Sequence, residues 1–91
     1  MIVTNKQTGN WLEVNEFGAE LFLRFKALFE KYGPYRAGLT TLAKALDTNT
    51  ASLNYWLFGF WKVGLINKEL KPGNKAYTYS IADLGGFEID D

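Results

Sequence analysis

The 91-residue chain carries ten basic and ten acidic residues, so its formal net charge is zero, and 47% of its residues are hydrophobic. This length supports one domain with a small core, and the hydrophobic fraction argues against disorder. The absence of cysteine and histidine excludes disulfides, thiolate or imidazole metal sites, cysteine nucleophiles and Ser-His-Asp triads. No apolar run approaches the roughly 20 residues of a membrane span. Since the N-terminus also lacks a signal-peptide core, we expect a cytoplasmic protein that does not contact a membrane.

Residues 1–14 are expected to form a short N-terminal arm. Within it, residues 11–14 fit either an edge strand or a segment that docks Trp11 on the body of the domain, and both alternatives stay open.

Residues 15–33 predict an amphipathic first helix. Asn15 is a candidate N-cap, and Gly33 followed by Pro34 ends the pattern. The apolar stripe at helical spacing comprises Phe17, Leu21, Phe25, Leu28 and Tyr32.

Three further apolar residues make this first helix more hydrophobic than one buried face requires: Phe22, Leu23 and Phe29. They either fill a small core between helix and sheet or form the seam of a homodimer.

Residues 40–64 predict two helices separated by a tight turn. Leu42, Ala43 and Leu46 repeat at helical spacing, and Thr40 or Thr41 is the candidate N-cap. Asp47 begins the turn, where an aspartate tolerates a left-handed backbone conformation.

The second helix of this pair begins after Asn49 or Thr50, either of which can cap it. Its helical spacing assigns six residues to the buried face: Leu53, Trp56, Leu57, Phe60, Trp61 and Gly64. The opposite face, which we expect to be exposed, carries Thr50, Ala51, Asn54, Tyr55, Phe58 and Lys62.

Residues 65–82 predict a β-hairpin, because the helical period gives way to two short strands around the turn-rich segment KPGNK. Residues 83–91 contain four acidic residues and no basic one, and we expect them to form an acidic C-terminal tail.

Residues 42–66, LAKALDTNTASLNYWLFGFWKVGLI, resemble the helix-turn-helix of winged-helix regulators of the MarR, ArsR and PadR type. The shared pattern is L-A-x-x-L, a three-residue turn, apolar residues in the registers of Leu53, Leu57 and Phe60, and then G-L-I, without a gap. Residues 79–85, YSIADLG, are similar to the Y-x-[LI]-T-x-x-G run that closes the wing in MarR- and PadR-like proteins, with Ala82 in place of Thr.

This resemblance implies one α+β, mostly helical, winged helix-turn-helix domain over residues 1–91, in which three helices precede a hairpin wing. It also implies a sequence-specific duplex DNA-binding protein that regulates transcription. Its second helix would be the recognition helix, with Thr50, Asn54, Tyr55 and Phe58 against the bases.

The charge distribution is compatible with that implication. Residues 31–75 hold seven basic and two acidic residues, an excess of five, which is the pattern of a modest phosphate-binding face. The candidate phosphate contacts are Arg36, Lys44, Lys68, Lys71 and Lys75. A lysine-rich hairpin tip is also common in proteins that bind no nucleic acid. The lysines of the hairpin therefore support DNA binding only because a helix-turn-helix pattern precedes them.

An alternative function rests on the same helix. It has no arginine, and Tyr55 with Phe58 makes an exposed aromatic strip that suits a protein partner, a dimer contact or stacking on an unpaired base. The chain would then be a non-catalytic adaptor or inhibitor on a winged-helix scaffold. For either function we expect no cofactor and no metal, and no enzyme, because no phosphate loop or metal motif frames the carboxylates.

A palindrome-reading regulator requires two linked copies. MarR- and PadR-like proteins continue into a C-terminal dimerisation helix that has no counterpart in this sequence. If the protein is such a regulator, we expect a homodimer through the first helix, with Phe22, Leu23 and Phe29; otherwise no dimer is expected.

Overall fold

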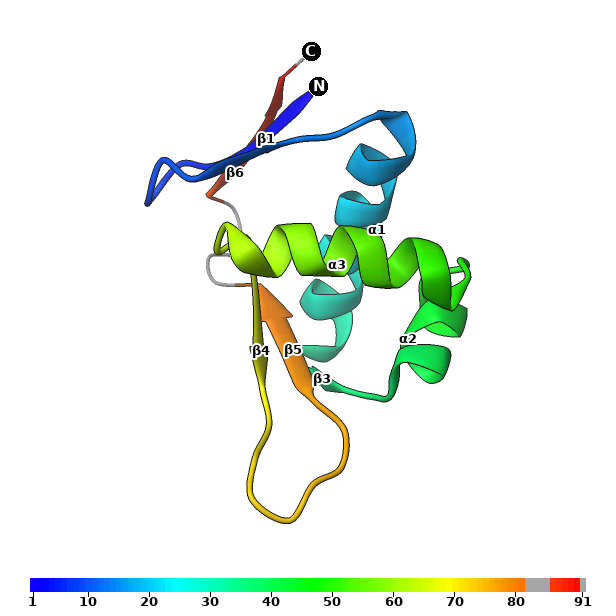
Figure 1. Ribbon diagram of the computed structural model, residues 1–91. Coiled ribbons are helices and arrows are strands. Elements are labelled where there is room, and N and C mark those ends of the chain that lie inside the picture. Colours follow the sequence, from blue (N-terminus) through cyan, green and yellow to red (C-terminus); the bar gives the residue numbers. More distant parts are fainter. Residues whose placement is uncertain (82–85, 91) are drawn as a thin grey trace.

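The computed structural model describes residues 1–81 and 86–90, which form a small α+β domain with three helices and two antiparallel sheets. The helices are α1 (Glu16–Tyr32), α2 (Leu39–Ala45) and α3 (Thr50–Lys62). The strands are β1 (Ile2–Asn5), β2 (Trp11–Glu13), β3 (Tyr35–Arg36), β4 (Ile66–Glu69), β5 (Thr78–Ile81) and β6 (Phe87–Asp90). In the view of Figure 1, α3 crosses in front of α1. Strands β1 and β6 lie above α3, and the hairpin of β4 and β5 lies below it.

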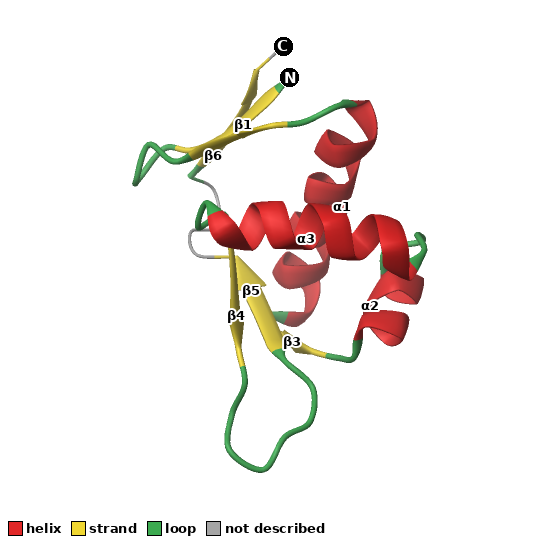
Figure 2. Ribbon diagram, in the orientation of Figure 1, coloured by secondary structure: helices red, strands yellow, loops and turns green. Residues whose placement is uncertain are grey.

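The first sheet has the order β2-β1-β6 and joins the two ends of the chain (Figure 2). Val3 lies opposite Leu12 on one side and Ile89 on the other, so all three side chains share the face that packs on the core. Of the two alternatives for residues 11–14, the edge strand is therefore confirmed. Trp11 points away from the core and is 58% exposed.

The expectation of an acidic tail is wrong for residues 87–90, which form β6. Phe87 and Ile89 alternate with Glu88 and Asp90, and this period of two lets the apolar pair face the core while the acidic pair stays exposed. Residues 82–85 and 91, which belong to the predicted wing and tail, lie outside the described residues.

Helix α1 begins and ends as the sequence predicts. The Asn15 side chain accepts a hydrogen bond from the backbone N–H of Gly18 at 2.8 Å, and Gly33 ends the helix with φ 70°. Leu21 and Phe25 of the predicted stripe are buried, whereas Phe17 and Tyr32, at its two ends, are exposed. The stripe thus identifies the middle of the buried face but overextends it.

Phe22 and Phe29 also lie on this buried face, so the expectation that they line a dimer seam is wrong. Phe22 packs edge-to-face on Phe60 of α3, with ring centroids 5.3 Å apart, and Phe29 is only 2% exposed. Leu23 is the one predicted seam residue at the surface, at 51% exposure. A single leucine does not make an interface, because stable contacts bury an area of many residues.

The second sheet has the order β3-β5-β4, in which β4 and β5 form the predicted hairpin. Ile66 lies opposite Ile81, and both side chains enter the core with Tyr79. Strand β3 was not predicted. It lies between the first helix and the helix pair, where Tyr35 pairs with Tyr79 and Arg36 pairs with Thr78. Two residues are too short to show an alternating pattern.

Helix α2 begins earlier than its sequence pattern indicates. Gly38 is its N-cap and offers no side-chain hydrogen bond, so neither Thr40 nor Thr41 is the cap. The turn after α2 agrees with the prediction, because Asp47 adopts the left-handed conformation with φ 54°. Asn49 then caps α3 by accepting a hydrogen bond from the backbone N–H of Ser52 at 2.8 Å.

Helix α3 buries Leu53, Leu57 and Phe60, as its spacing predicts. Trp61 was assigned to the same face, and this was wrong, because its side chain is 40% exposed. Trp56 is partly buried and stacks on Phe60, with centroids 6.1 Å apart. The buried face of α3 is thus narrower than the apolar stripe, and the aromatic residues at its margin, Trp56 and Trp61, reach the surface.

Candidate functional site

The N-terminal half of α3 presents the side chains that were predicted to contact bases. Thr50, Asn54, Tyr55 and Phe58 are all exposed, with Tyr55 at 71% and Phe58 at 56%. Thr50, Asn54 and Phe58 are four residues apart and form a row on the surface of α3 beside the buried Leu57, and Tyr55 lies farther round the helix. The structure therefore makes these four side chains available to a ligand.

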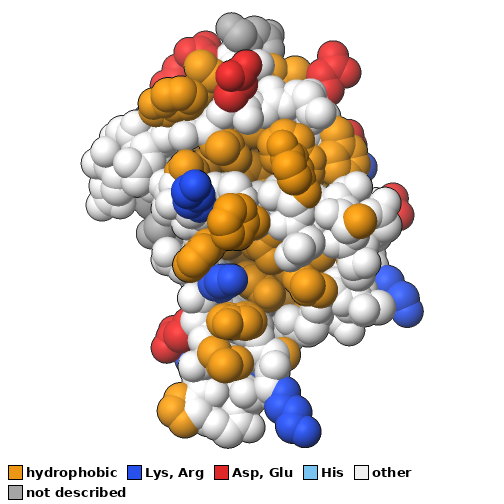
Figure 3. All heavy atoms as spheres, in the orientation of Figure 1, with side chains coloured by type: hydrophobic (Ala, Val, Ile, Leu, Met, Phe, Trp, Pro, Cys, Tyr) orange, Lys and Arg blue, Asp and Glu red, His pale blue; other side chains and the backbone are white. Residues whose placement is uncertain are grey.

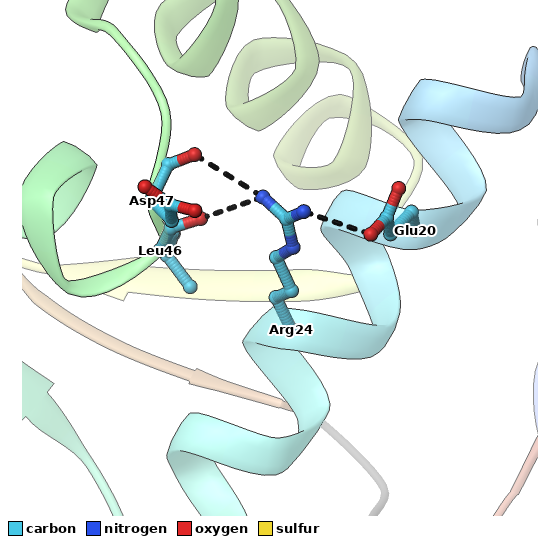
Figure 4. Close-up of polar contacts among 4 residues, drawn as sticks. All are labelled: Glu20, Arg24, Leu46 and Asp47. Carbon is cyan, nitrogen blue, oxygen red and sulfur yellow. Dashed lines mark hydrogen bonds and ion pairs between the residues drawn. The ribbon is translucent and has the colours of Figure 1, made fainter.

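The orientation of α3 is set by a contact between α1 and the turn before α3 (Figure 4). The Arg24 guanidinium donates hydrogen bonds to the carbonyl oxygens of Leu46, at 3.0 Å, and Asp47, at 3.2 Å. It also forms an ion pair with Glu20 at 2.7 Å. Arg24 thus satisfies carbonyls that the end of α2 leaves without helical partners.

A glycine on α1 seats the middle of α3. A Cβ atom added at Gly18 would lie 2.8 Å from the Trp56 ring, closer than real Cβ contacts come. Because no side chain is present there, the six-membered ring of the indole comes close to α1 at Gly18. This close approach fixes the rotation of α3 and hence which side chains it exposes.

Lys68 lies in β4 opposite Tyr79, outside the hairpin loop that holds Lys71 and Lys75. Its ammonium nitrogen is 4.3 Å from the Trp61 ring centroid and 4.9 Å from that of Tyr77. Such cation–π contacts hold the charge between α3 and the hairpin. A phosphate would have to compete with two aromatic rings for the Lys68 ammonium group. Lys68 is therefore a weaker candidate for a phosphate contact than Lys71 and Lys75.

Lys71 and Lys75 are exposed in the eight-residue loop between β4 and β5, which is longer than the five-residue turn that the sequence indicates. Gly73 has φ 83°, and Pro72 lacks the N–H that would extend the ladder. Arg36 of β3 donates a hydrogen bond to the Asn74 side chain at 2.8 Å, which ties this loop to the sheet. Arg36 therefore positions the loop with one of its five donors and keeps the others.

The face formed by α3 and the hairpin is continuous. Asn54 and Phe58 of α3 line a hollow of about 140 Å³ together with Lys68 and Tyr77 of the hairpin. Three predicted residues are thereby brought together. Lys44 is exposed in the last turn of α2, and Thr50 begins α3; neither lines this hollow.

A second, larger groove of about 460 Å³ runs between α3 and strand β2. Tyr55 and Phe58 line it from the helix, and Leu12 and Glu13 line it from the strand. Gly59 forms part of its floor, where a Cβ would lie 3.2 Å from a methyl carbon of Leu12. This groove was not predicted, because it depends on the sheet that residues 87–90 complete.

Hydrophobic side chains dominate the face of Figure 3, across α3 and the hairpin, with few basic groups among them. Three exposed apolar residues of α2, α3 and the hairpin loop were not identified from the sequence: Leu39, Trp61 and Tyr77. The exposure of Trp61 was not predicted, because helical spacing shows on which side of the helix a residue lies. It does not show whether the neighbouring sheet reaches far enough to cover that residue. Tyr77 was expected in a strand, but it precedes β5 and stays at the surface.

Tyr79, in the hairpin beside this face, has a raised pKa. Burial raises the pKa of its phenol, and the neighbouring Tyr77 raises it further. A neutral phenol in the core is therefore a structural feature of the hairpin root and not a reactive group.

No family model, no curated protein and no solved structure matches this chain. Among the described residues, no helix is long and apolar enough to cross a membrane.

Proposed function

We propose that this chain is a winged-helix protein that binds duplex DNA to regulate transcription, with α3 as the recognition helix and the β4–β5 hairpin as the wing. The arrangement of helix and hairpin supports this. Asn54 of α3 and Lys68 of β4 line one hollow, so the helix face and the hairpin face the same side. A duplex that received α3 in its major groove would meet the hairpin along its backbone.

The observation that carries the proposal is the segregation of charge between elements. Helices α2 and α3 contain Lys44 and Lys62 and no acidic residue, whereas α1 balances three acidic residues with three basic ones. Lys44, Lys71 and Lys75 are exposed around α3 and on the hairpin loop. Phosphate contacts supply a large share of the affinity of such proteins, and between Arg36 and Lys75 the chain carries only two acidic residues, Asp47 and Glu69.

Base reading would fall to the two polar side chains at the start of α3. The Asn54 amide can donate to and accept from the N7 and N6 edge of adenine, and Thr50 can contribute a hydroxyl. Tyr55 and Phe58 offer apolar contact to thymine methyl groups. This assignment predicts a preference for A·T pairs at the centre of a half-site.

Two charge-matched variants test the proposal. Lys71→Glu combined with Lys75→Glu should weaken binding to every duplex and flatten its salt dependence, since both residues would contact phosphate. Lys6→Glu combined with Lys26→Glu makes the same change in net charge outside α2, α3 and the hairpin, and it should leave more of the affinity intact. Equal losses for the two pairs would show that only net charge matters and would contradict a wing contact.

Asn54→Ala tests base reading separately. It should relax the preference at one base position, by about 1–3 kcal/mol, and leave the salt dependence unchanged. A selection from random duplexes, compared between the wild type and this variant, measures the change. Identical preferences would remove Asn54 from the interface.

The aromatic surface favours a second candidate function, a non-catalytic protein-binding module. Tyr55, Phe58, Trp61 and Tyr77 are all exposed on one side, and aromatic residues of this kind dominate the affinity of protein interfaces. In that case duplex DNA would bind weakly, partner binding would depend little on salt, and Phe58→Ala would abolish it. Binding that survives the Lys71 and Lys75 reversals but is lost with Phe58 would favour this function.

A further inference from the structure

Strand β2 has a free edge beside the 460 Å³ groove. In its pairing with β1, backbone hydrogen bonds run from Val14 N to Met1 O and from Asn5 N to Asn10 O. Antiparallel strands alternate between hydrogen-bonded and non-hydrogen-bonded pairs, so Leu12 also bonds toward β1. The N–H and C=O groups of the two residues between, Trp11 and Glu13, consequently point away from β1.

These outward groups find no backbone partner among the described residues, because β2 ends the sheet order β2-β1-β6. An unpaired edge next to an apolar groove is a template for another strand. The sheet orders leave three other edges, β6, β4 and β3, which suit this role less well. Strand β6 carries Glu88 and Asp90 and β4 carries Lys68 and Glu69, whereas β2 carries one charged residue, and charged side chains oppose strand addition. Strand β3 has only two residues.

We propose that the free edge of β2 pairs with β2 of a second copy of this chain, forming a homodimer with one continuous six-stranded sheet. The phase of the outward groups lets only Trp11 and Glu13 form hydrogen-bonded pairs across the interface, and the register that uses both residues of each strand places Trp11 opposite Glu13. Trp11 of one copy would lie opposite Glu13 of the other, exchanging both backbone hydrogen bonds, and Leu12 would lie opposite Leu12 on a two-fold axis.

In this register the side chains of the two copies are compatible, as are their backbone hydrogen-bonding groups. Glu13 meets Trp11 and not a second carboxylate, so no like charges stand directly opposite each other. Leu12 lies on the core face of the sheet, beside the groove formed by Tyr55, Phe58 and Gly59. The Leu12 side chain of the second copy would enter that groove and cover apolar surface of α3.

The pairing has a consequence for α3. The two-fold axis of an antiparallel strand pair stands perpendicular to the sheet, so elements that pack on one face of the sheet in one copy pack on the same face in the other. Both α3 helices would then lie on one side of the six-stranded sheet. This dimer does not depend on DNA binding, and it replaces the α1 seam, whose phenylalanines are buried.

Single cysteines test the register, because the wild-type chain contains none. Trp11→Cys and Glu13→Cys proteins, mixed in equal amounts and mildly oxidised, should form a disulfide, since paired residues place Cα atoms about 5.5 Å apart. Each protein alone should crosslink far less, because diagonal positions are about 7–8 Å apart. Thr8→Cys, exposed in the β1–β2 turn, measures random collision.

Sedimentation at high micromolar concentration, without DNA, tests the dimer itself. The wild type and Glu13→Ala should sediment as dimers. Glu13→Pro should sediment as a monomer, because proline removes an outward N–H and leaves the bonds to β1 intact. Circular dichroism establishes that the proline variant is folded.

A monomeric wild type would overturn the proposal, as would a dimer that Glu13→Pro leaves intact. Crosslinking of the mixture no faster than that of Thr8→Cys would overturn the register even if a dimer forms. None of these readouts involves nucleic acid, so failure of the dimer and failure of DNA binding are separable.

Discussion

Arg24 on α1 donates a hydrogen bond to the carbonyl oxygen of Leu46, 22 residues later in the chain, at the point where α2 ends. The same guanidinium reaches the carbonyl of Asp47, whose positive φ turns the chain toward α3. One side chain on the first helix thus ties the turn between α2 and α3 to α1. The direction of α3 therefore depends on a long-range contact and not only on the residues of the turn.

Replacing Arg24 with Ala should lower the free energy of unfolding by about 1 kcal/mol. The two carbonyl oxygens lose a charged donor, but the side chain is partly exposed and water replaces part of the contact. Glu20→Gln removes only the exposed ion pair and should cost less than about 0.5 kcal/mol. Chemical denaturation of both variants checks the difference; equal effects would show that the carbonyl contacts contribute nothing.

Phe60→Ala should lower the free energy of unfolding by about 3–5 kcal/mol, because it removes a fully buried ring that packs on Phe22 and Phe25. Phe58→Ala, two residues away on the exposed face, should change stability by about 0.5 kcal/mol or less. Thermal melts of the two proteins make the comparison. A Phe60 variant that melts like the wild type would mean that the buried face of α3 is wrongly assigned.

Gly18→Ala should destabilise the domain by about 1 kcal/mol or more, although alanine favours helix formation over glycine. The added methyl would meet the Trp56 ring at 2.8 Å, so the indole would have to shift from its packing against α1 and Phe60. In a Trp56→Leu background the same substitution should be neutral or stabilising, because the ring is gone. The double-mutant cycle isolates this contact, and additive effects would argue against it.

Stability should fall as the pH rises above about 10, the ordinary pKa of tyrosine. Burial raises the pKa of Tyr79, so the folded state retains a proton that the unfolded state loses in this range, and ionisation favours unfolding. Below that range the contribution is fully present. Tyr79→Phe should flatten the alkaline part of the profile, whereas Tyr55→Phe, at an exposed position, should not. Superimposable profiles for the wild type and Tyr79→Phe would contradict this account.

Local signals in the sequence predicted most of the helical structure. Asn15 and Asn49 are caps because their side chains reach the N–H groups three residues on, and such contacts need no information from distant residues. The left-handed turn at Asp47 is likewise local. The order of the three helices and the β4–β5 hairpin followed from these signals.

The errors arise where distant segments meet. Strand β6 forms because β1 lies beside it, and four residues with two carboxylates resemble a solvated tail when read alone. The burial of Phe22 and Phe29 and the exposure of Trp61 depend on which neighbours cover each helix. Periodicity identifies an apolar face, but it does not show whether the domain itself or another molecule covers it.

The sequence likewise predicted the exposed residues of the candidate site within α3, but not its contacts between elements. Thr50, Asn54, Tyr55 and Phe58 were placed on the exposed face from helical spacing, and the structure has them there. The contacts of Lys68 with Trp61 and Tyr77 could not be foreseen, because they join α3 to the hairpin across space. The groove at β2 was likewise hidden from the sequence.

The most direct test of the proposed function is the salt dependence of binding to random duplex DNA by the wild-type protein. Each phosphate contact contributes about −0.9 to the slope of log affinity against log salt concentration. Arg36, Lys44, Lys71 and Lys75 are exposed, and if all four contact phosphate the slope should be roughly −3.6 for each bound copy. A slope near zero, or no measurable binding at low salt, would contradict the proposal that this domain binds DNA.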